Sequence, residues 1–264
     1  MPIITLTTDM GLKDYYVAAV KGAVMKQIPA ALIIDISHEI TPFNIIEAAF
    51  VIKNSYPEFP VGTIHIIGVN YESQKEKAIN VVVEHKGQFF IGPDSGIFSM
   101  IFDTPPEKMV QLENKDVSGF HTFAVKNLYI ETAAQIARGA KVEELGSTLE
   151  NPERRLMFRP TFDTIDRKDV IKGVITYIDS YSNIFTNITQ RDFVDFGKGR
   201  GFEIFFSNKA YNITTIHNSY GDVPAGERLA LFGATGYLEI AINQGAAAKL
   251  LGMKVSETVR VEFD

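Results

Sequence analysis

Apolar residues recur along the first 150 residues in two alternating patterns, one typical of buried strands and one of amphipathic helices. Apolar, β-branched runs predict buried strands at residues 3–8, 31–36 and 62–69. Helical spacing follows the first run over residues 15–27 and returns over residues 129–140. The alternation predicts an α/β fold in which a mainly parallel sheet carries helices on both faces.

Turn and cap residues predict two further elements within the first 150 residues. Thr41 and Pro42 predict a helix through Lys53, with Thr41 as its cap and Pro42 at the first helical position. Residues 78–84 and 88–91 alternate as a hairpin would, closed at Lys86 and Gly87. We therefore assign residues 1–150 to an N-terminal α/β domain.

The pattern changes after residue 150. Residues 151–169 carry prolines and charged clusters without periodicity, which favours a linker between domains. Short β-like runs separated by turns then predict a smaller, antiparallel, β-barrel-like C-terminal domain over residues 170–264. The runs lie at residues 170–178, 201–206, 210–214, 228–232, 238–242 and 255–263.

Composition narrows the class of protein. With 26 basic and 32 acidic residues the net charge is −6, which argues against a nucleic-acid or membrane-surface partner. The chain has no cysteine, no apolar run of membrane-spanning length and no secretory leader pattern, so we expect a cytoplasmic protein. Its five histidines lack metal-ligand spacing, and no glycine-rich phosphate loop is present, so we expect no metal and no cofactor.

Polar residues at strand ends are the remaining candidates for chemistry. Asp9 follows the first predicted strand, Asn70 and Tyr71 follow the third, and Asp179 and Asn183 follow the first strand of the C-terminal domain. Open α/β sheets bind ligands at such ends, although an Asp before a helix is also a common cap. Carboxylates and amides placed in this way suit a nucleoside. The nearby aromatic residues Phe43, Tyr71 and Tyr181 offer either stacking or core packing.

Several segments together resemble the S-adenosylmethionine hydroxide adenosyltransferases, which are relatives of the fluorinase and chlorinase enzymes. The matching segments are ITLTTDMG at 4–11, DISHEITP at 35–42, FIGPDSG at 90–96, YIDSYSNIFTNI at 177–188, DVPAG at 222–226 and GATGYLEIAINQGAA at 233–247. The resemblance implies the two-domain fold already described, a homotrimer, and an adenosyl ligand between one subunit's N-terminal domain and its neighbour's C-terminal domain.

The resemblance also assigns roles to residues. It implies that Asp9 binds the ribose hydroxyls and that Phe43 lies in the ligand site. It places Asp179 near the methionine amino group and Asn183 near the adenine, which the backbone from Ala234 to Gly236 would also face. Members of the family attack C5′ of the nucleoside with water or halide and expel methionine as a neutral thioether. The expected molecule is thus S-adenosylmethionine, as a substrate or ligand and not as a cofactor.

This chain departs from the family's hydrolases at the residues thought to handle water. Asn70 stands at the position of an Asp and Lys77 at that of an Arg, while the His position falls on Ala124 or, with a three-residue shift, on His121. Asn cannot accept a proton as a carboxylate can, and Lys lacks the planar fork of Arg.

Three functions therefore stay open. The first is a hydrolase giving adenosine and L-methionine, with Asn70, Lys77 and His121 as an altered catalytic set. The second is a non-catalytic adenosyl-binding relative, and a blander variant of it is a fold relative whose pocket holds another ligand. The third is a halide-using member, because Asn70-Tyr71 is similar to the Thr-Tyr pair of halogenating enzymes.

Overall fold

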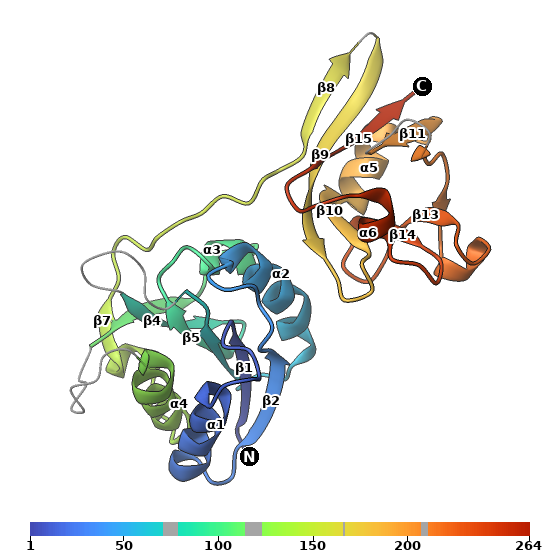
Figure 1. Ribbon diagram of the computed structural model, residues 1–264. Helices are drawn as coiled ribbons and strands as arrows, with labels where there is room; N and C mark the ends of the chain where they lie inside the picture. The colour runs from blue at the N-terminus through green and yellow to red at the C-terminus, as the bar shows by residue number, and fades with distance from the viewer. Residues whose placement is uncertain (71–78, 114–122, 166, 207–210) are drawn as a thin grey trace. The chain divides into compact units, whose positions relative to one another are not determined.

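A computed structural model describes residues 1–70, 79–113, 123–165, 167–206 and 211–264. The chain divides into two compact units, Met1–Leu156 and Met157–Asp264 (Figure 1). Among the described residues no helix combines the length and the apolar character that crossing a bilayer requires.

The first unit is built on one seven-stranded sheet in the order β2-β1-β3-β5-β4-β6-β7. The pairs β1–β2, β1–β3 and β3–β5 are parallel, and β4 pairs antiparallel with both β5 and β6. The strands are β1 Ile3–Thr8, β2 Leu32–Ser37, β3 Ile64–Gly68, β4 Asn80–His85, β5 Gln88–Pro93, β6 Lys108–Leu112 and β7 Gly146–Thr148. The helices are α1 Tyr16–Gln27, α2 Ile45–Ser55, α3 Phe98–Ile101 and α4 Ile130–Ala137, with short turns η1 Tyr56–Glu58, η3 Val125–Tyr129 and η4 Val142–Glu144.

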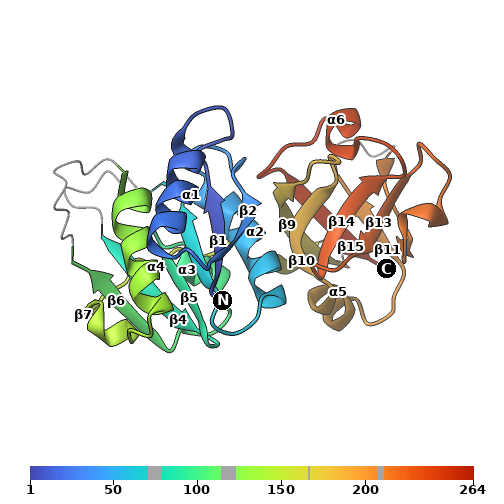
Figure 2. The same ribbon diagram turned by 90° about the horizontal axis from the view of Figure 1, so that it is seen from below.

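Helices cover both faces of this sheet. Helices α1 and α4 contact each other over one face, and α2 and α3 contact each other over the other (Figure 1; Figure 2). Alternation along the strands sorts the side chains, because Ile4 and Leu6 point into the core beneath α1 and α4. On the opposite face Thr5 bonds to the buried ring of His65, which stacks on Phe90. The predicted α/β class is confirmed.

Two local expectations were wrong. β2 is the outer strand of the sheet, and its burial is only partial, because just one of its sides pairs with another strand. The helix expected to start at Pro42 begins at Ile45 instead, capped by Asn44, whose side chain accepts the N–H of Glu47 at 3.1 Å. An Asn at this position caps as well as a Thr, and Phe43 takes a left-handed conformation that no helix allows.

The second unit is an eight-stranded, almost entirely antiparallel sheet in the order β11-β15-β9-β10-β14-β13-β12, with β8 paired to β9. β8 lies within residues 151–169, the range expected to be a linker, and hydrogen-bonds along β9. The strands are β8 Thr161–Ile165, β9 Lys168–Ile178, β10 Ile184–Thr189, β11 Phe202–Phe205, β12 Ile216–His217, β13 Arg228–Phe232, β14 Tyr237–Ile242 and β15 Thr258–Phe263. The helices are α5 Gln190–Gly197, α6 Ala247–Leu251 and the turn η6 Tyr220–Asp222.

This sheet curls around its own core. Strand β11 at one end of the strand order and β13 next to the other end contribute Ile204 and Ala230 to one apolar cluster, together with Ile240 of β14. Such curling gives the barrel-like second unit that the sequence predicted. Of the expected run at 210–214, the described part forms only an isolated bridge, from Ile213 to Ile204.

Candidate functional site

Asp9 lies at the carboxyl edge of the first unit's sheet, directly after β1. Its Oδ2 accepts the backbone N–H of Phe43 at 2.8 Å and that of Asn70 at 3.4 Å. The carboxylate therefore links the ends of β1 and β3 to the segment before α2. It does not cap the helix that follows it, because α1 begins after Tyr15 and has no side-chain cap. Within the described part of the chain no donor bonds Oδ1 of Asp9, so this oxygen is available to hydroxyl donors of a ligand.

Both residues that donate to Asp9 have left-handed backbones. The φ angle is 66° at Phe43 and 50° at Asn70. Asn tolerates this region, but a bulky aromatic residue rarely adopts it, and the Phe43 ring is 70 % exposed. Core packing is thus not the reason for the aromatic side chain. Strain of this kind concentrates where a site requires a particular backbone, here one that aims two N–H groups at one carboxylate.

A chain of polar contacts lies behind Asp9, with its inner members Thr8 and His38 buried and its outer members Asp35 and Lys21 partly exposed. Thr8 Oγ1 lies 2.8 Å from His38 Nδ1, and His38 Nε2 lies 3.1 Å from Asp35 Oδ1. Lys21 Nζ contacts the other oxygen of Asp35 at 2.5 Å. Burial alone would raise the pKa of Asp35, but its bonds to Lys21 and His38 outweigh burial and lower it.

This chain fixes the backbone on both sides of Asp9. Thr8 Oγ1 also accepts the N–H of Met10 at 3.4 Å, and the carbonyl of His38 accepts the N–H of Gly11 at 2.8 Å. With the Thr8 hydroxyl donating to Nδ1, the remaining ring proton of His38 sits on Nε2 and faces Asp35. The turn after β1 is thereby held in one conformation, and with it the carboxylate of Asp9.

In the second unit, Asp179 and Asn183 belong to the tight turn between β9 and β10. Asp179 Oδ1 accepts the backbone N–H of Asn183 at 2.7 Å, and its Oδ2 accepts the side-chain amide at 3.2 Å. Ser182, between them, has φ of 71° and is buried, whereas Tyr181 is 81 % exposed. The structure thus brings these two predicted residues into direct contact.

The strand register places further side chains on the same face as this turn. Phe185 of β10 pairs with Tyr177 of β9 on one side and with Glu239 of β14 on the other. Their neighbours Ile184 and Ile240 point into the core, so these three side chains point to the outer face of the sheet. The rings of Tyr177 and Phe185 lie 6.0 Å apart. This outer face combines aromatic and acidic groups.

Glu239 is nevertheless only 2 % exposed, because the segment around η6 covers it. Tyr220 of that segment donates its hydroxyl to Glu239 Oε1 at 2.7 Å. Burial raises the pKa of Glu239, the Tyr220 bond opposes this, and the negative charge of Asp179 adds to the rise. Burial and the bond to Glu239 likewise raise the pKa of Tyr220, so its phenol stays protonated.

The predicted backbone segment from Ala234 to Gly236 forms the turn between β13 and β14. Gly236 donates its N–H to Gly233 at 3.0 Å and has φ of 70°, which a glycine adopts without strain. A Cβ added at Gly233 would lie 3.3 Å from Glu239 Oε2, so Glu239 reaches from the strand to this turn. The carbonyl of Gly236 accepts the N–H of Gln190 at 2.9 Å, which ties the turn to the start of α5.

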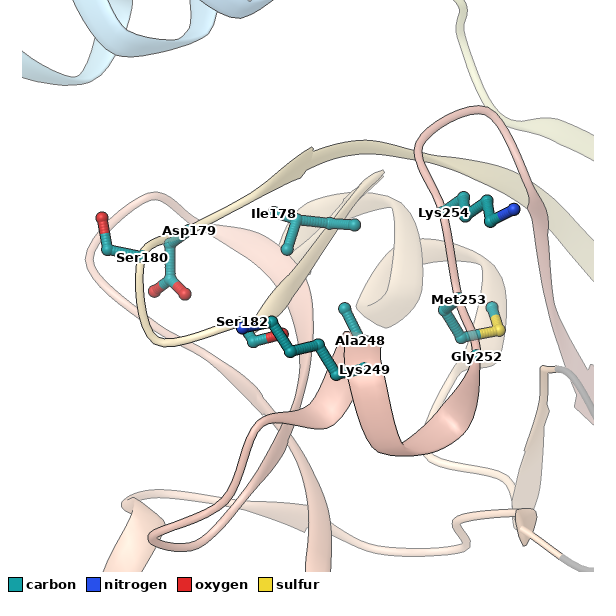
Figure 3. A pocket seen from close by; sticks show the side chains of 9 residues that line it. All are labelled: Ile178, Asp179, Ser180, Ser182, Ala248, Lys249, Gly252, Met253 and Lys254. Carbon is teal, nitrogen blue, oxygen red and sulfur yellow. The ribbon is translucent and has the colours of Figure 1, made fainter. Parts of the chain in front are cut away.

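A pocket of about 480 Å³ opens beside the turn that carries Asp179. Figure 3 shows that its lining side chains include apolar ones, such as Ile178 and Met253, and that the Lys249 side chain extends from α6 toward the turn. Its lining residues are Ile178, Asp179, Ser180, Ser182, Ala248, Lys249, Gly252, Met253 and Lys254. Asp179 is therefore reachable by a small molecule.

Three predicted residues, Tyr71, Lys77 and His121, lie outside the described residues. Ala124, the alternative to His121, directly precedes η3 and offers no proton donor or acceptor in its side chain. No group of three His, Asp or Glu side chains suited to a metal ion occurs in the described ranges.

His38, Phe185 and Glu239 lie in segments that match the family, but sequence reasoning assigned no role to any of them. The signal for Glu239 was present, because a single acidic residue interrupts the apolar run of residues 238–242 and must be paired or placed at a site. The contributions of His38 and Phe185 depend on which strands pair and in what register, and local sequence does not show this.

Comparisons with known proteins agree with this architecture. Family models described as the SAM hydroxide adenosyltransferase N-terminal and C-terminal domains match residues 4–146 and 173–260. A structure titled as an uncharacterized conserved protein from Thermotoga maritima superimposes with a TM-score of 0.86 at 26 % identity, covering 99 % of both chains.

Curated relatives match over nearly the whole length. An (R)-S-adenosyl-L-methionine hydrolase of Methanocaldococcus jannaschii is 28 % identical, covering 100 % of this chain and 97 % of the relative. A fluorinase of Actinopolyspora mzabensis is 24 % identical, covering 98 % of this chain and 97 % of the relative. Since the two family models together match well over half of the residues, the chain belongs to the SAM hydroxide adenosyltransferase family.

Proposed function

We propose that this protein binds S-adenosylmethionine and hydrolyses it to adenosine and L-methionine by attack of water at C5′. The observation that carries the proposal is Asp9, a strand-end carboxylate held by the N–H groups of Phe43 and Asn70, with one oxygen open to ribose hydroxyls. Membership of a family with S-adenosylmethionine hydrolases among its curated relatives supports the choice of substrate.

The proposed reaction needs no cofactor. Water forms a bond to C5′, the C5′–S bond breaks, its electron pair neutralises the sulfonium, and the water's proton is released. A sulfonium is a good leaving group, so the protein's main contribution is to position and desolvate the water. We propose that Asp9 of one subunit anchors the ribose and that Asp179 with Asn183 of a neighbouring subunit holds other polar groups of the ligand.

Asn70 decides how water is handled in this proposal. It follows β3, and its left-handed backbone places it at the sheet edge beside Asp9. Its amide can orient a water molecule but cannot take the proton. We propose that Asn70, with Lys77 and His121, forms the divergent water-handling set, and that Tyr71 lies beside the ligand.

Asn70, at the position where the family's hydrolases have an Asp, also favours a second candidate, a non-catalytic adenosyl-binding protein. The two candidates differ in one experiment, in which purified protein is incubated with S-adenosylmethionine while adenosine and methionine are quantified. Product above the spontaneous rate supports the hydrolase. Tight nucleoside binding by calorimetry without product supports the binder.

Halide use is a less favoured variant. Its support is the similarity of Asn70-Tyr71 to the Thr-Tyr pair of halogenating members. Adding chloride or fluoride to the same incubation and measuring a 5′-halogenated nucleoside distinguishes it from hydrolysis. We also propose a cytoplasmic homotrimer, for which sedimentation equilibrium gives the mass to compare with 29.4 kDa per chain.

A further inference from the structure

Among the described residues, Glu239 is the only acidic side chain that is buried. It lies outside the apolar core of the second unit, on the outer face of β14, under Tyr220. Burying a carboxylate is costly unless the group is paired, and its hydrogen bond comes from a neutral phenol. Within the described chain no lysine or arginine forms an ion pair with it.

Glu239 shares its face with the predicted ligand residues. Phe185 lies directly beside it in register, and Tyr177 and the turn of Asp179 continue the same face across β10 and β9. On the other side its Oε2 reaches the turn at Gly233. Two carboxylates, those of Glu239 and Asp179, thus act on one face, close enough for the charge of Asp179 to disfavour ionisation of Glu239.

We propose that Glu239 makes this site select a positively charged adenosyl ligand, a sulfonium, over the neutral thioether of the same shape. The inference rests on the proposed function and adds a specificity-determining residue to it. Glu239 acts through its field and does not touch the reacting atoms. A positive charge at the sulfur position is attracted by both carboxylates, whereas an uncharged thioether sulfur at that position is not, and the amino-acid ammonium is the same in both ligands.

Tyr220 has a separate role in this arrangement. Its hydroxyl donates to one oxygen of Glu239, and this bond favours the ionised carboxylate against the opposing effect of burial on the pKa of Glu239. The cover over Glu239 also excludes water, which lowers the local dielectric and lengthens the reach of the charge. Selection by charge would help release the neutral products after the sulfonium is lost.

The test compares two cations with one neutral ligand by calorimetry at pH 7.5 on the full chain. The cations are S-adenosylmethionine and its non-hydrolysable analogue with an ammonium-bearing carbon in place of the sulfonium. The neutral ligand is S-adenosylhomocysteine, which has a thioether there. Glu239→Gln removes the charge and still accepts the Tyr220 hydroxyl, while Tyr220→Phe is the matched control that removes the bond and keeps the charge.

We expect the wild type to bind both cations more tightly than the thioether. Glu239→Gln should weaken both cations about tenfold and change the thioether less than twofold, as expected for a charge acting across several ångströms at a partly buried site. Tyr220→Phe should keep the preference. Equal weakening of all three ligands, or no change, would overturn the inference.

If Glu239→Gln does not fold, the affinities of the wild type alone still decide whether the site prefers cations over the thioether. A wild type that binds the thioether as tightly as the cations has no charge selection, and the inference fails while the adenosyl site stands. A wild type that binds none of the three overturns the proposed function itself, and the inference with it.

Discussion

The Oδ2 atom of Asp9 lies 2.8 Å from the backbone nitrogen of Phe43, a residue with φ of 66° and a ring that is 70 % exposed. An exposed aromatic ring on a strained backbone does not serve packing. Its N–H donates to the carboxylate, and its ring is left exposed. Replacing either Asp9 or Phe43 therefore tests whether the ligand binds at this place in the first unit.

Replacing Asp9 by Ala should weaken adenosine binding by roughly 2–4 kcal/mol, because two hydrogen bonds from ribose hydroxyls to a charged acceptor are lost. Calorimetry with adenosine gives the value. Asp14→Ala, on the exposed segment that follows, is the matched control and should leave affinity unchanged. Equal affinity of wild type and Asp9→Ala would refute the ribose role.

Phe43→Gly should change the stability of the protein and its affinity for adenosine in opposite directions. Glycine adopts the left-handed backbone without strain, so the free energy of unfolding should rise by about 0.5 kcal/mol after glycine's own entropic cost. Adenosine affinity should fall if the ring contacts the ligand. Lys86→Gly removes a similar left-handed residue (φ 52°) in the β4–β5 turn and should change stability alone. A Phe43→Gly protein that binds as tightly as the Lys86→Gly protein would show that the ring is not part of the site.

His38→Gln tests the polar chain behind Asp9. Losing the contacts to Thr8 and Asp35 in a buried place should cost about 1–3 kcal/mol of unfolding free energy, measured by urea denaturation. Adenosine affinity should fall as well, since the turn around Asp9 loosens. His217→Gln, in the second unit, is the control variant. Full stability together with full affinity in His38→Gln would contradict the positioning role.

His65 should make stability depend on pH. Burial lowers the pKa of His65 to about 4, from the 6.5 of an exposed histidine. Between these values the unfolded chain binds a proton that the folded chain does not, so stability falls as pH decreases through this window. From pH 6.5 to 5 the loss should be about 2 kcal/mol. His65→Gln should flatten this slope in urea titrations, and an unchanged slope would show that His65 is protonated in the folded protein.

Local sequence predicted the parts of the fold that local physics determines. The β-branched run before Asp9 forms β1, and the Lys86-Gly87 turn closes β4 onto β5. The strand expected at residues 31–36 was predicted to be buried like β1. It forms β2, Leu32–Ser37, at an edge of the sheet, because apolar content does not reveal how many partners a strand has.

In the candidate site too, local sequence identified some residues, and others became apparent only from the pairing of strands. Asp9, Asp179 and Asn183 were identified because a polar residue at the end of an apolar run is visible in the sequence. Glu239 lies next to Phe185 only through the register of β10 and β14, and Tyr220 reaches it from 19 residues away. Such contacts depend on tertiary pairing, which no window of sequence contains.

The central claim is hydrolysis at C5′ despite an Asn at position 70. Purified protein incubated with S-adenosylmethionine, with adenosine and methionine quantified by chromatography against a protein-free blank, tests it most directly. The account predicts equimolar adenosine and methionine above the blank, and loss of both products in the Asp9→Ala protein. Adenosine and methionine at the rate of the blank, from protein that binds adenosine tightly, would contradict it.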